Sequence, residues 1–317
     1  MKPHRFSPEN PLKIGTRGSA LALAQANEVR DLLLNAHAMD KESVTVKAIK
    51  TSGDSIIDKP LSDIGGKGLF TKEIEKALLE GEIDIAVHSS KDMATELPEG
   101  LALNVFLPRE DVRDVFIGRE VDTLDNLAQG ATIGSASLRR QAQLKRYRSD
   151  FNVIIFRGNV QTRLRKLGEG IADATLLAAA GLNRLKMADI ASHYLEPEAF
   201  LPACGQGAIC IETRKNDQAI DDFIHSLHDE NTGAAIRAER AFLNMLDGSC
   251  RTPIAGLATI EGERLSFKGE VLRPDGSESY SVEEAGSIDN AIRIGEEAGK
   301  RLKSQLSADF LDTLQQR

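Results

Sequence analysis

The chain has 317 residues, of which 41% are hydrophobic and 28% charged, and this composition predicts a folded protein of two or three domains. No apolar run approaches the ~18 residues that a membrane-spanning helix needs, and the N-terminal residues contain no apolar signal segment, so we expect a cytoplasmic protein without a membrane partner. The net charge of −8 argues against bulk binding of nucleic acid. The three cysteines, an odd number without a CxxC pair, argue against a disulfide scaffold and against a cysteine-rich zinc site.

The first part of the chain alternates short apolar runs with amphipathic runs. Apolar or alternating residues predict strands at 12–16, 43–50 and 83–87. Helical spacing of apolar residues follows Ser19, a possible N-cap, and also follows the turn Gly65–Gly68. Strands separated by helices predict a mostly parallel sheet with crossover helices.

The middle of the chain repeats this alternation, and the last part does not. Strands are predicted at 132–134, 152–156 and 208–212, helices at 138–147 and 160–167, and a buried strand or strand-to-helix junction at 174–180. From about Asp229 a helix at 232–246 precedes successive strands at 254–260, 264–272 and 277–284 and a last helix at 288–306. Consecutive strands joined by tight turns predict a small antiparallel α+β domain.

One weak internal repetition favours two related halves. Ile14–Arg17 and Ile133–Ala136 both join a strand to a helix through a Gly and a hydroxyl side chain. Backbone N–H groups at such a junction can bind an anion. Two such junctions that faced each other would form a cleft.

The positive charge is concentrated in one segment. Between Arg139 and Lys166 there are nine Lys or Arg residues and one acid, Asp150, which is a local balance of +8 in an acidic chain. A solvated helix face is the common origin of a basic cluster. A basic segment in an acidic protein also fits a focused site for an anionic ligand.

Candidate binding residues follow the predicted strands, where ligands of open α/β sheets bind. Each cation is an Arg or Lys that can bind carboxylates or phosphates, and the set comprises Arg17, Lys91, Arg139, Arg140, Arg157 and Arg163. One carboxylate, Asp92, stands out among them, directly after a predicted buried strand. We therefore expect a multiply charged anionic substrate, with Asp92 handling a proton or positive charge that appears during a reaction.

Other chemistries have little support in the sequence. Cys250 lies in a loop beside Arg251, which favours the thiolate, but residue type alone leaves its role open. Cys204 and Cys210 are predicted to be core residues. His225 and His228 have no third ligand, so no metal site is expected. Neither a Walker A motif nor a GxSxG elbow is present.

With these residues assembled, the sequence resembles the porphobilinogen deaminases, also called hydroxymethylbilane synthases. The resemblance extends from Ile14 to Gly256 and is carried, in the order of the family, by IGTRGSALALAQA, GGKGLFTKEIE, DIAVHSSKDM, GSASLRRQAQL, RGNVQTRLRKL, LPACGQGAICIE and LDGSCRTPIAG.

The resemblance implies an activity and a cofactor. The family condenses four porphobilinogen molecules head to tail, releases ammonia each time, and frees the linear tetrapyrrole hydroxymethylbilane. It uses a dipyrromethane cofactor, made from its own substrate and attached through a thioether to the cysteine that matches Cys250. The carboxylate that matches Asp92 stabilises cationic pyrrole and azafulvene species and assists proton movement.

The resemblance also implies a set of binding residues. The residues matching the family's cofactor contacts are Arg17, Ser19, Lys91, Ser137, Arg139, Arg140, Arg157, Arg163 and Gln206. The residues matching its substrate contacts are Lys67, Arg17, Arg157 and Arg163. Two cofactor rings and four substrate rings carry twelve carboxylates, which agrees with the local positive charge.

The implied fold has two α/β domains like those of type 2 periplasmic binding proteins and a small C-terminal α+β domain with a three-stranded antiparallel sheet. The first domain would be discontinuous, with residues 1–107 and 203–228. The second, 108–202, would carry the arginines, and the third, 229–317, would present Cys250. A monomer is the family expectation.

Two other classes of protein fit parts of this sequence less well than the enzyme that the resemblance implies. The same two-domain fold serves as a solute-binding module, whose Arg-lined cleft would capture an anion without chemistry, but the third domain and Cys250 argue against it. A transcription regulator would need a helix-turn-helix ahead of Leu12, where about a dozen residues are too few for one.

Overall fold

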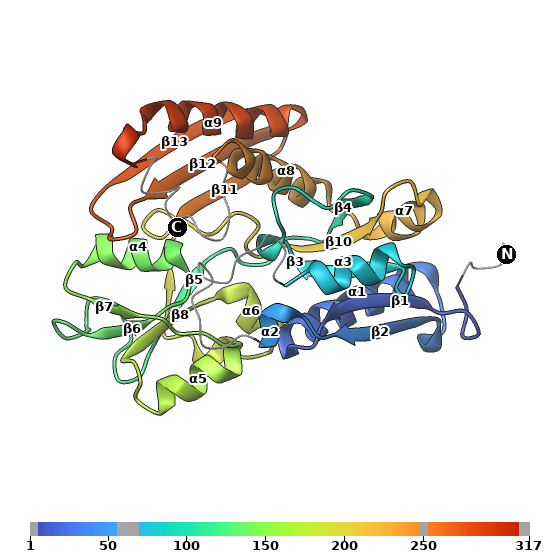
Figure 1. Ribbon diagram of the computed structural model, residues 1–317, viewed down its shortest axis with the longest axis horizontal. Coiled ribbons are helices and arrows are strands. Elements are labelled where there is room, and N and C mark those ends of the chain that lie inside the picture. The colour runs from blue at the N-terminus through green and yellow to red at the C-terminus, as the bar shows by residue number, and fades with distance from the viewer. Residues whose placement is uncertain (1–5, 56–69, 247–252, 311–317) are drawn as a thin grey trace. The chain divides into compact units, whose positions relative to one another are not determined.

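The computed structural model describes residues 6–55, 70–246 and 253–310, and the chain divides into two compact units (Figure 1). Of the described residues, unit 1 comprises 6–55, 70–109 and 208–233. Unit 2 comprises 110–207, 234–246 and 253–310. The division into three domains stays a prediction.

Unit 1 is built on a five-stranded sheet with the order β2-β1-β3-β10-β4. The strands are β1 (Leu12–Arg17), β2 (Val44–Ile49), β3 (Ile85–Ser89), β4 (Leu101–Phe106) and β10 (Ile209–Arg214). The helices are α1 (Ala20–His37), α2 (Ser52–Ser55), α3 (Lys72–Leu79) and α7 (Gln218–Ile224), with short 3₁₀ turns at Lys41–Ser43, Ser90–Asp92 and His225–Leu227.

Helices cover both faces of this sheet, and the alternation of side chains along β3 shows how. Ile85 and Val87 pack with the apolar side of α1, whereas Ala86 packs with Ile74 and the rest of the apolar side of α3. Both faces of β3 are therefore buried, which is why its sequence is an almost continuous apolar run. A polar residue within this strand, such as His88, must be buried too.

Unit 2 contains a second five-stranded sheet, with the order β7-β6-β8-β5-β9. The strands are β5 (Asp114–Gly118), β6 (Thr132–Gly134), β7 (Asn152–Ile154), β8 (Ala174–Ala178) and β9 (His193–Leu195). The helices are α4 (Leu138–Tyr147), α5 (Val160–Gly168) and α6 (Ala179–Arg184), with a 3₁₀ turn at Ala188–Ile190. Two buried apolar clusters, one around Phe116 and one around Phe156, fill its interior.

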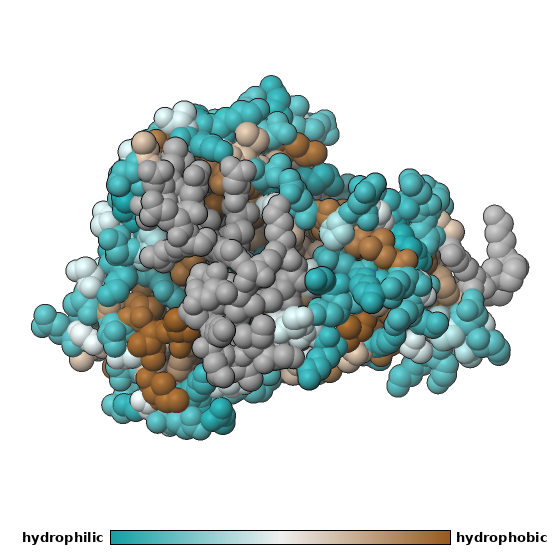
Figure 2. All heavy atoms as spheres, viewed as in Figure 1, coloured by the Kyte–Doolittle hydropathy of each residue, from teal (hydrophilic) through white to brown (hydrophobic). Residues whose placement is uncertain are grey.

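Unit 2 also contains a three-stranded antiparallel sheet formed by β11 (Ile254–Glu261), β12 (Arg264–Leu272) and β13 (Ser279–Ser287). Helix α9 (Ala291–Gln305) and most of α8 (Glu230–Met245) pack with this sheet around a core that includes Phe242 and Phe267. Among the residues that are coloured in Figure 2, hydrophilic ones predominate on the face in view, and hydrophobic ones gather in a few patches.

The two five-stranded sheets share one topology. β1 pairs in parallel with β2 and β3, as β6 does with β7 and β8. β10 pairs antiparallel with β3 and β4, as β5 does with β8 and β9. The weak sequence repetition at Ile14–Arg17 and Ile133–Ala136 therefore marks equivalent strands, β1 and β6, of a structural repeat.

The expected fold class is confirmed: two α/β sheets and a small α+β part with a three-stranded antiparallel sheet. The expectation of mostly parallel pairing is wrong, because half of the strand pairs in each large sheet are antiparallel. The sequence prediction also missed β4, β5 and β9. The segment at 174–180 is a strand-to-helix junction, β8 followed by α6.

Candidate active site

The end of β3 leads directly into the turn that carries the candidate carboxylate. After Ser89 the chain forms the 3₁₀ turn Ser90–Asp92, which contains both Lys91 and Asp92. The Asp92 side chain is 39% exposed, and its Oδ2 atom lies 4.0 Å from a guanidinium nitrogen of Arg17, the last residue of the neighbouring β1. The structure therefore brings Arg17, Lys91 and Asp92 together at one edge of the sheet of unit 1.

This edge is partly enclosed. A cavity of about 50 Å³ is lined by Arg17 and Asp92 together with polar side chains of Thr16, Ser19 and His88. Ser19 is the N-cap of α1, and its Oγ atom accepts a hydrogen bond from the backbone N–H of Ala22 at 3.3 Å. The predicted cap is confirmed, and the start of a helix is directed at this cavity.

Arg17 also contacts an aromatic ring. Its guanidinium carbon lies 4.2 Å from the centre of the Phe70 ring, which lines the same cavity. Stacking of this kind holds the planar guanidinium group while its N–H groups remain able to bind an anion.

Equivalent strand ends in unit 2 lead into capped helices. Ser137, after β6, caps α4 and accepts a hydrogen bond from the N–H of Arg140 at 3.4 Å. Asn159, after β7, caps α5 and accepts one from Thr162 at 2.9 Å. The N-terminal ends of two helices and the basic residues between them thus lie at the carboxyl edge of this sheet.

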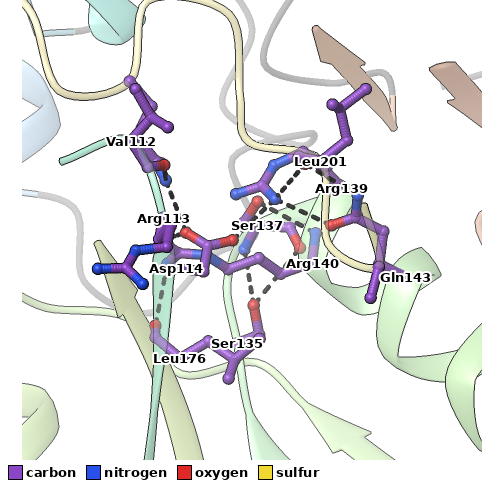
Figure 3. Close-up of polar contacts among 12 residues, drawn as sticks. Val112, Arg113, Asp114, Ser135, Ser137, Arg139, Arg140, Gln143, Leu176 and Leu201 are labelled. Carbon is purple, nitrogen blue, oxygen red and sulfur yellow. Dashed lines mark hydrogen bonds and ion pairs between the residues drawn. The ribbon is translucent and has the colours of Figure 1, made fainter. Parts of the chain in front are cut away.

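Arg139 and Arg140 are buried around a carboxylate that the sequence analysis did not single out. Asp114, the first residue of β5, is fully buried, and its two oxygens lie 2.8 Å from Arg139 and 2.7 Å from Arg140 (Figure 3). Burial alone would raise the pKa of Asp114, but the two guanidinium groups hold it far below its ordinary value. Three charged groups share one desolvated site.

Main-chain and amide groups complete this cluster. Arg139 donates to Oε1 of Gln143 and to the carbonyl of Leu201, both at 2.9 Å, and Arg140 donates to the carbonyl of Leu176 at 2.9 Å. Gln206 donates to Asp114 Oδ1 at 2.8 Å. Of the residues expected from the sequence, the structure brings Ser137, Arg139, Arg140 and Gln206 together.

Arg157 and Arg163 belong to the next strand and helix. Arg157 follows β7 and is 8% exposed, and burial lowers the pKa of its guanidinium group. Arg163 lies on α5, and its Nε atom donates to the carbonyl of Gly158 at 2.9 Å. Lys67 and Cys250 lie outside the described residues.

A second buried acidic group, in unit 1, was also missed. His88 on β3 lies 3.1 Å from Glu212 on β10, and both side chains are almost completely buried. Glu75 of α3 is 6% exposed; burial raises its pKa, and Glu212 adds to the rise. These residues occupy the face of the sheet that α3 covers, and the only pattern visible there in the sequence is the apolar helical spacing of α3.

The arrangement suits a ligand with several carboxylates. In each unit, cationic side chains and helix N-terminal ends provide donors, and in unit 1 Asp92 provides a carboxylate beside Arg17. Among residues 6–55, 70–246 and 253–310, no group of three His, Cys, Asp or Glu residues could hold a metal ion. No helix in the described part of the chain is long and apolar enough to cross a membrane.

Two family models and two curated relatives, all porphobilinogen deaminases, match most of the chain. The family model "Porphobilinogen deaminase, dipyromethane cofactor binding domain" matches residues 12–222, and "Porphobilinogen deaminase, C-terminal domain" matches residues 234–304. A porphobilinogen deaminase of Nitrobacter hamburgensis is 55% identical over 94% of each chain. One of Paracoccus denitrificans is 52% identical over 96% of this chain and 97% of its own. Among solved structures, the methionine-binding protein MetQ is similar with a TM-score of 0.44 and 12% identity, covering 70% of this chain and 91% of MetQ.

Proposed function

The chain belongs to the porphobilinogen deaminase family, and on that premise we propose how its own residues carry out the reaction. The protein is a deaminating transferase. It joins four porphobilinogen molecules head to tail into hydroxymethylbilane, and each condensation releases one molecule of ammonia. The observation that supports the role of the residues best is the placement of Asp92 beside Arg17 at the edge of the sheet.

The chain's donors fit the family's dipyrromethane cofactor. Two pyrrole rings carry four carboxylates, and the described part of the chain offers buried or half-buried cations together with helix N-terminal ends at two strand edges. Buried Nε atoms of Arg139 and Arg140 have no hydrogen-bond partner among the described residues, as expected of donors that await a ligand. When bound, the cofactor supplies a free α-carbon to which the first porphobilinogen unit is joined.

In this proposal the anchor is Cys250, and the remaining residues bind carboxylates. The cofactor contacts are Arg17, Ser19, Lys91, Ser137, Arg139, Arg140, Arg157, Arg163 and Gln206. The substrate contacts are Lys67, Arg17, Arg157 and Arg163. Asp92 stabilises the positive charge that develops as ammonia leaves and accepts or returns a proton. Arg17 holds a substrate carboxylate while Phe70 supports its guanidinium group.

The test of the anchor is the intact mass of the purified protein, followed by peptide mapping. We expect an excess equal to two porphobilinogen units less two ammonias, located on Cys250. Cys250→Ala should lack this mass, whereas the control Cys204→Ala, which alters a buried thiol, should keep it. An adduct that persists in Cys250→Ala would contradict the assignment. If wild-type protein gained no adduct after incubation with porphobilinogen, a solute-binding module would be the better description.

The test of Asp92 is Asp92→Asn, which should stay folded and loaded but lose turnover by at least ~100-fold, the usual contribution of a positioned acid or base. Asp84→Asn is the control, because Asp84 precedes the same strand at its opposite end, where it accepts a hydrogen bond from the N–H of Lys13. Wild-type turnover in Asp92→Asn would remove this residue from the mechanism.

We also propose a monomeric cytoplasmic protein that binds no nucleic acid. Buried thiols at Cys204 and Cys210 support a reducing compartment, and the acidic net charge disfavours nucleic acid. Light scattering after gel filtration checks the monomer: a mass of twice the chain would contradict it.

A further inference from the structure

Asp114 has the geometry of a counterion built for two arginines. Its carboxylate is fully buried and contacts one guanidinium group with each oxygen. It belongs to β5, whereas the arginines belong to the first turn of α4, so the contact joins two elements of the same sheet edge. Figure 3 shows the side chains of Arg139 and Arg140 converging on it.

The charges of this cluster do not cancel. Two guanidinium groups and one carboxylate leave a net charge of +1 in a site where Arg139 is 4% and Arg140 5% exposed. Two buried cations without a counterion would be strongly unfavourable. One further carboxylate would neutralise the cluster, and it could accept hydrogen bonds from the Nε–H groups of both arginines, which have no partner within the described part of the chain.

We propose that Asp114 is a positioning residue that holds Arg139 and Arg140 ready for the cofactor and leaves them the charge to bind one of its carboxylates. Preformed donors lose little freedom when the ligand arrives, which favours binding of the first pyrrole units. The proposal rests on the proposed function, because it assumes that the chain assembles its cofactor from porphobilinogen.

The test follows cofactor assembly separately from turnover. Apoprotein is produced in cells that cannot make porphobilinogen, and the covalently loaded fraction is measured by intact mass after a fixed time at increasing porphobilinogen concentration. We expect Asp114→Asn to raise the concentration for half-loading about tenfold, the effect of one charge-assisted hydrogen bond. The KM of the loaded fraction should stay within about twofold of wild type.

The matched control is Asp111→Asn. Asp111 lies three residues away and pairs with Arg113, which is not one of the candidate binding residues. It should load like wild type. A merely structural role for Asp114 would lower the melting temperature of Asp114→Asn but leave the half-loading concentration of the folded protein unchanged, and that result would overturn the proposal.

A second variant covers the case in which Asp114→Asn does not fold. Gln143→Met keeps the side-chain volume but removes the amide oxygen that Arg139 contacts. It should shift half-loading in the same direction by a smaller factor, and an unchanged concentration would again overturn the proposal. Failure of wild-type apoprotein to load at all would instead refute the proposed function.

Discussion

Replacing Gly276 by Ala should destabilise unit 2 and separate the small antiparallel sheet from α4. Gly276 lies in the turn between β12 and β13 with φ +73°, a conformation that disfavours residues with a Cβ atom. An added Cβ would also meet backbone atoms of α4, namely the nitrogen of Arg146, the carbonyl oxygen of Ala142 at 2.7 Å and the carbonyl carbon of Lys145 at 2.8 Å. Backbone atoms cannot move aside as a side chain can.

The expected size of this effect has two parts. The left-handed conformation costs an Ala about 1–2 kcal/mol, and overpacking adds about 1–3 kcal/mol. Gly262→Ala isolates the first part, because Gly262 lies in the turn between β11 and β12 with φ +60° and has no atom within 4 Å of the added Cβ. The difference between the two variants therefore measures the contact between the turn and α4.

Differential scanning calorimetry of both variants and the wild type provides the comparison. At about 2–4 °C per kcal/mol for a domain of 150–250 residues, Gly276→Ala should melt at least about 2 °C below Gly262→Ala. Equal melting temperatures would refute the contact. The first turn of α4 carries Arg139 and Arg140. The fraction of Gly276→Ala that carries the covalent cofactor therefore reports whether the three-stranded sheet β11-β12-β13 supports these binding residues.

Two further predictions concern buried carboxylates. Glu239 accepts hydrogen bonds from the N–H groups of Gly205 at 2.6 Å and Ala258 at 2.8 Å. Glu239→Gln has one acceptor oxygen fewer, so its free energy of unfolding, measured with urea, should be about 2–3 kcal/mol below that of wild type. A decrease of less than about 0.5 kcal/mol would contradict this prediction. Burial raises the pKa of Glu75, and a raised folded-state pKa contributes stability below the unfolded-state value that is lost as the pH rises. The stability of Glu75→Gln relative to wild type should therefore increase as the pH rises from 4.5 to 7. A difference in stability that does not change with pH would refute this prediction.

Much of the site could be predicted from the sequence because its signals are local. Ser19 as a helix cap, the turn after β3 with Asp92, and the start of α4 each depend on a few consecutive residues, and all three occur as predicted. Such patterns reflect backbone hydrogen bonding at the ends of elements, which neighbouring residues determine.

The partners of these residues could not be predicted in the same way. Asp114 contacts residues 25 and 26 positions away, and Glu212 contacts His88 across 124 positions, so no periodicity connects them. The sequence does contain a signal for Asp114, because this carboxylate directly precedes the apolar run Val115–Ile117. In the same way, His88 directly follows the apolar run Ile85–Val87. The strands β4, β5 and β9 were missed because pairing of short antiparallel strands is decided by distant segments.

The order of strands in unit 1 has a consequence for synthesis on the ribosome. β10 lies between β3 and β4, yet it is made about 100 residues after β4 ends, with the whole second α/β sheet encoded in the interval. At ~5–20 residues per second, β3 and β4 wait ~5–20 s with unpaired backbone groups. Residues 110–207, which contain the second α/β sheet, are continuous in sequence and can fold in that time. The sheet of unit 1 cannot be completed until β10 has been made. A nascent chain stalled before Ile209 should therefore expose the β3 and β4 edges to chaperones and to aggregation.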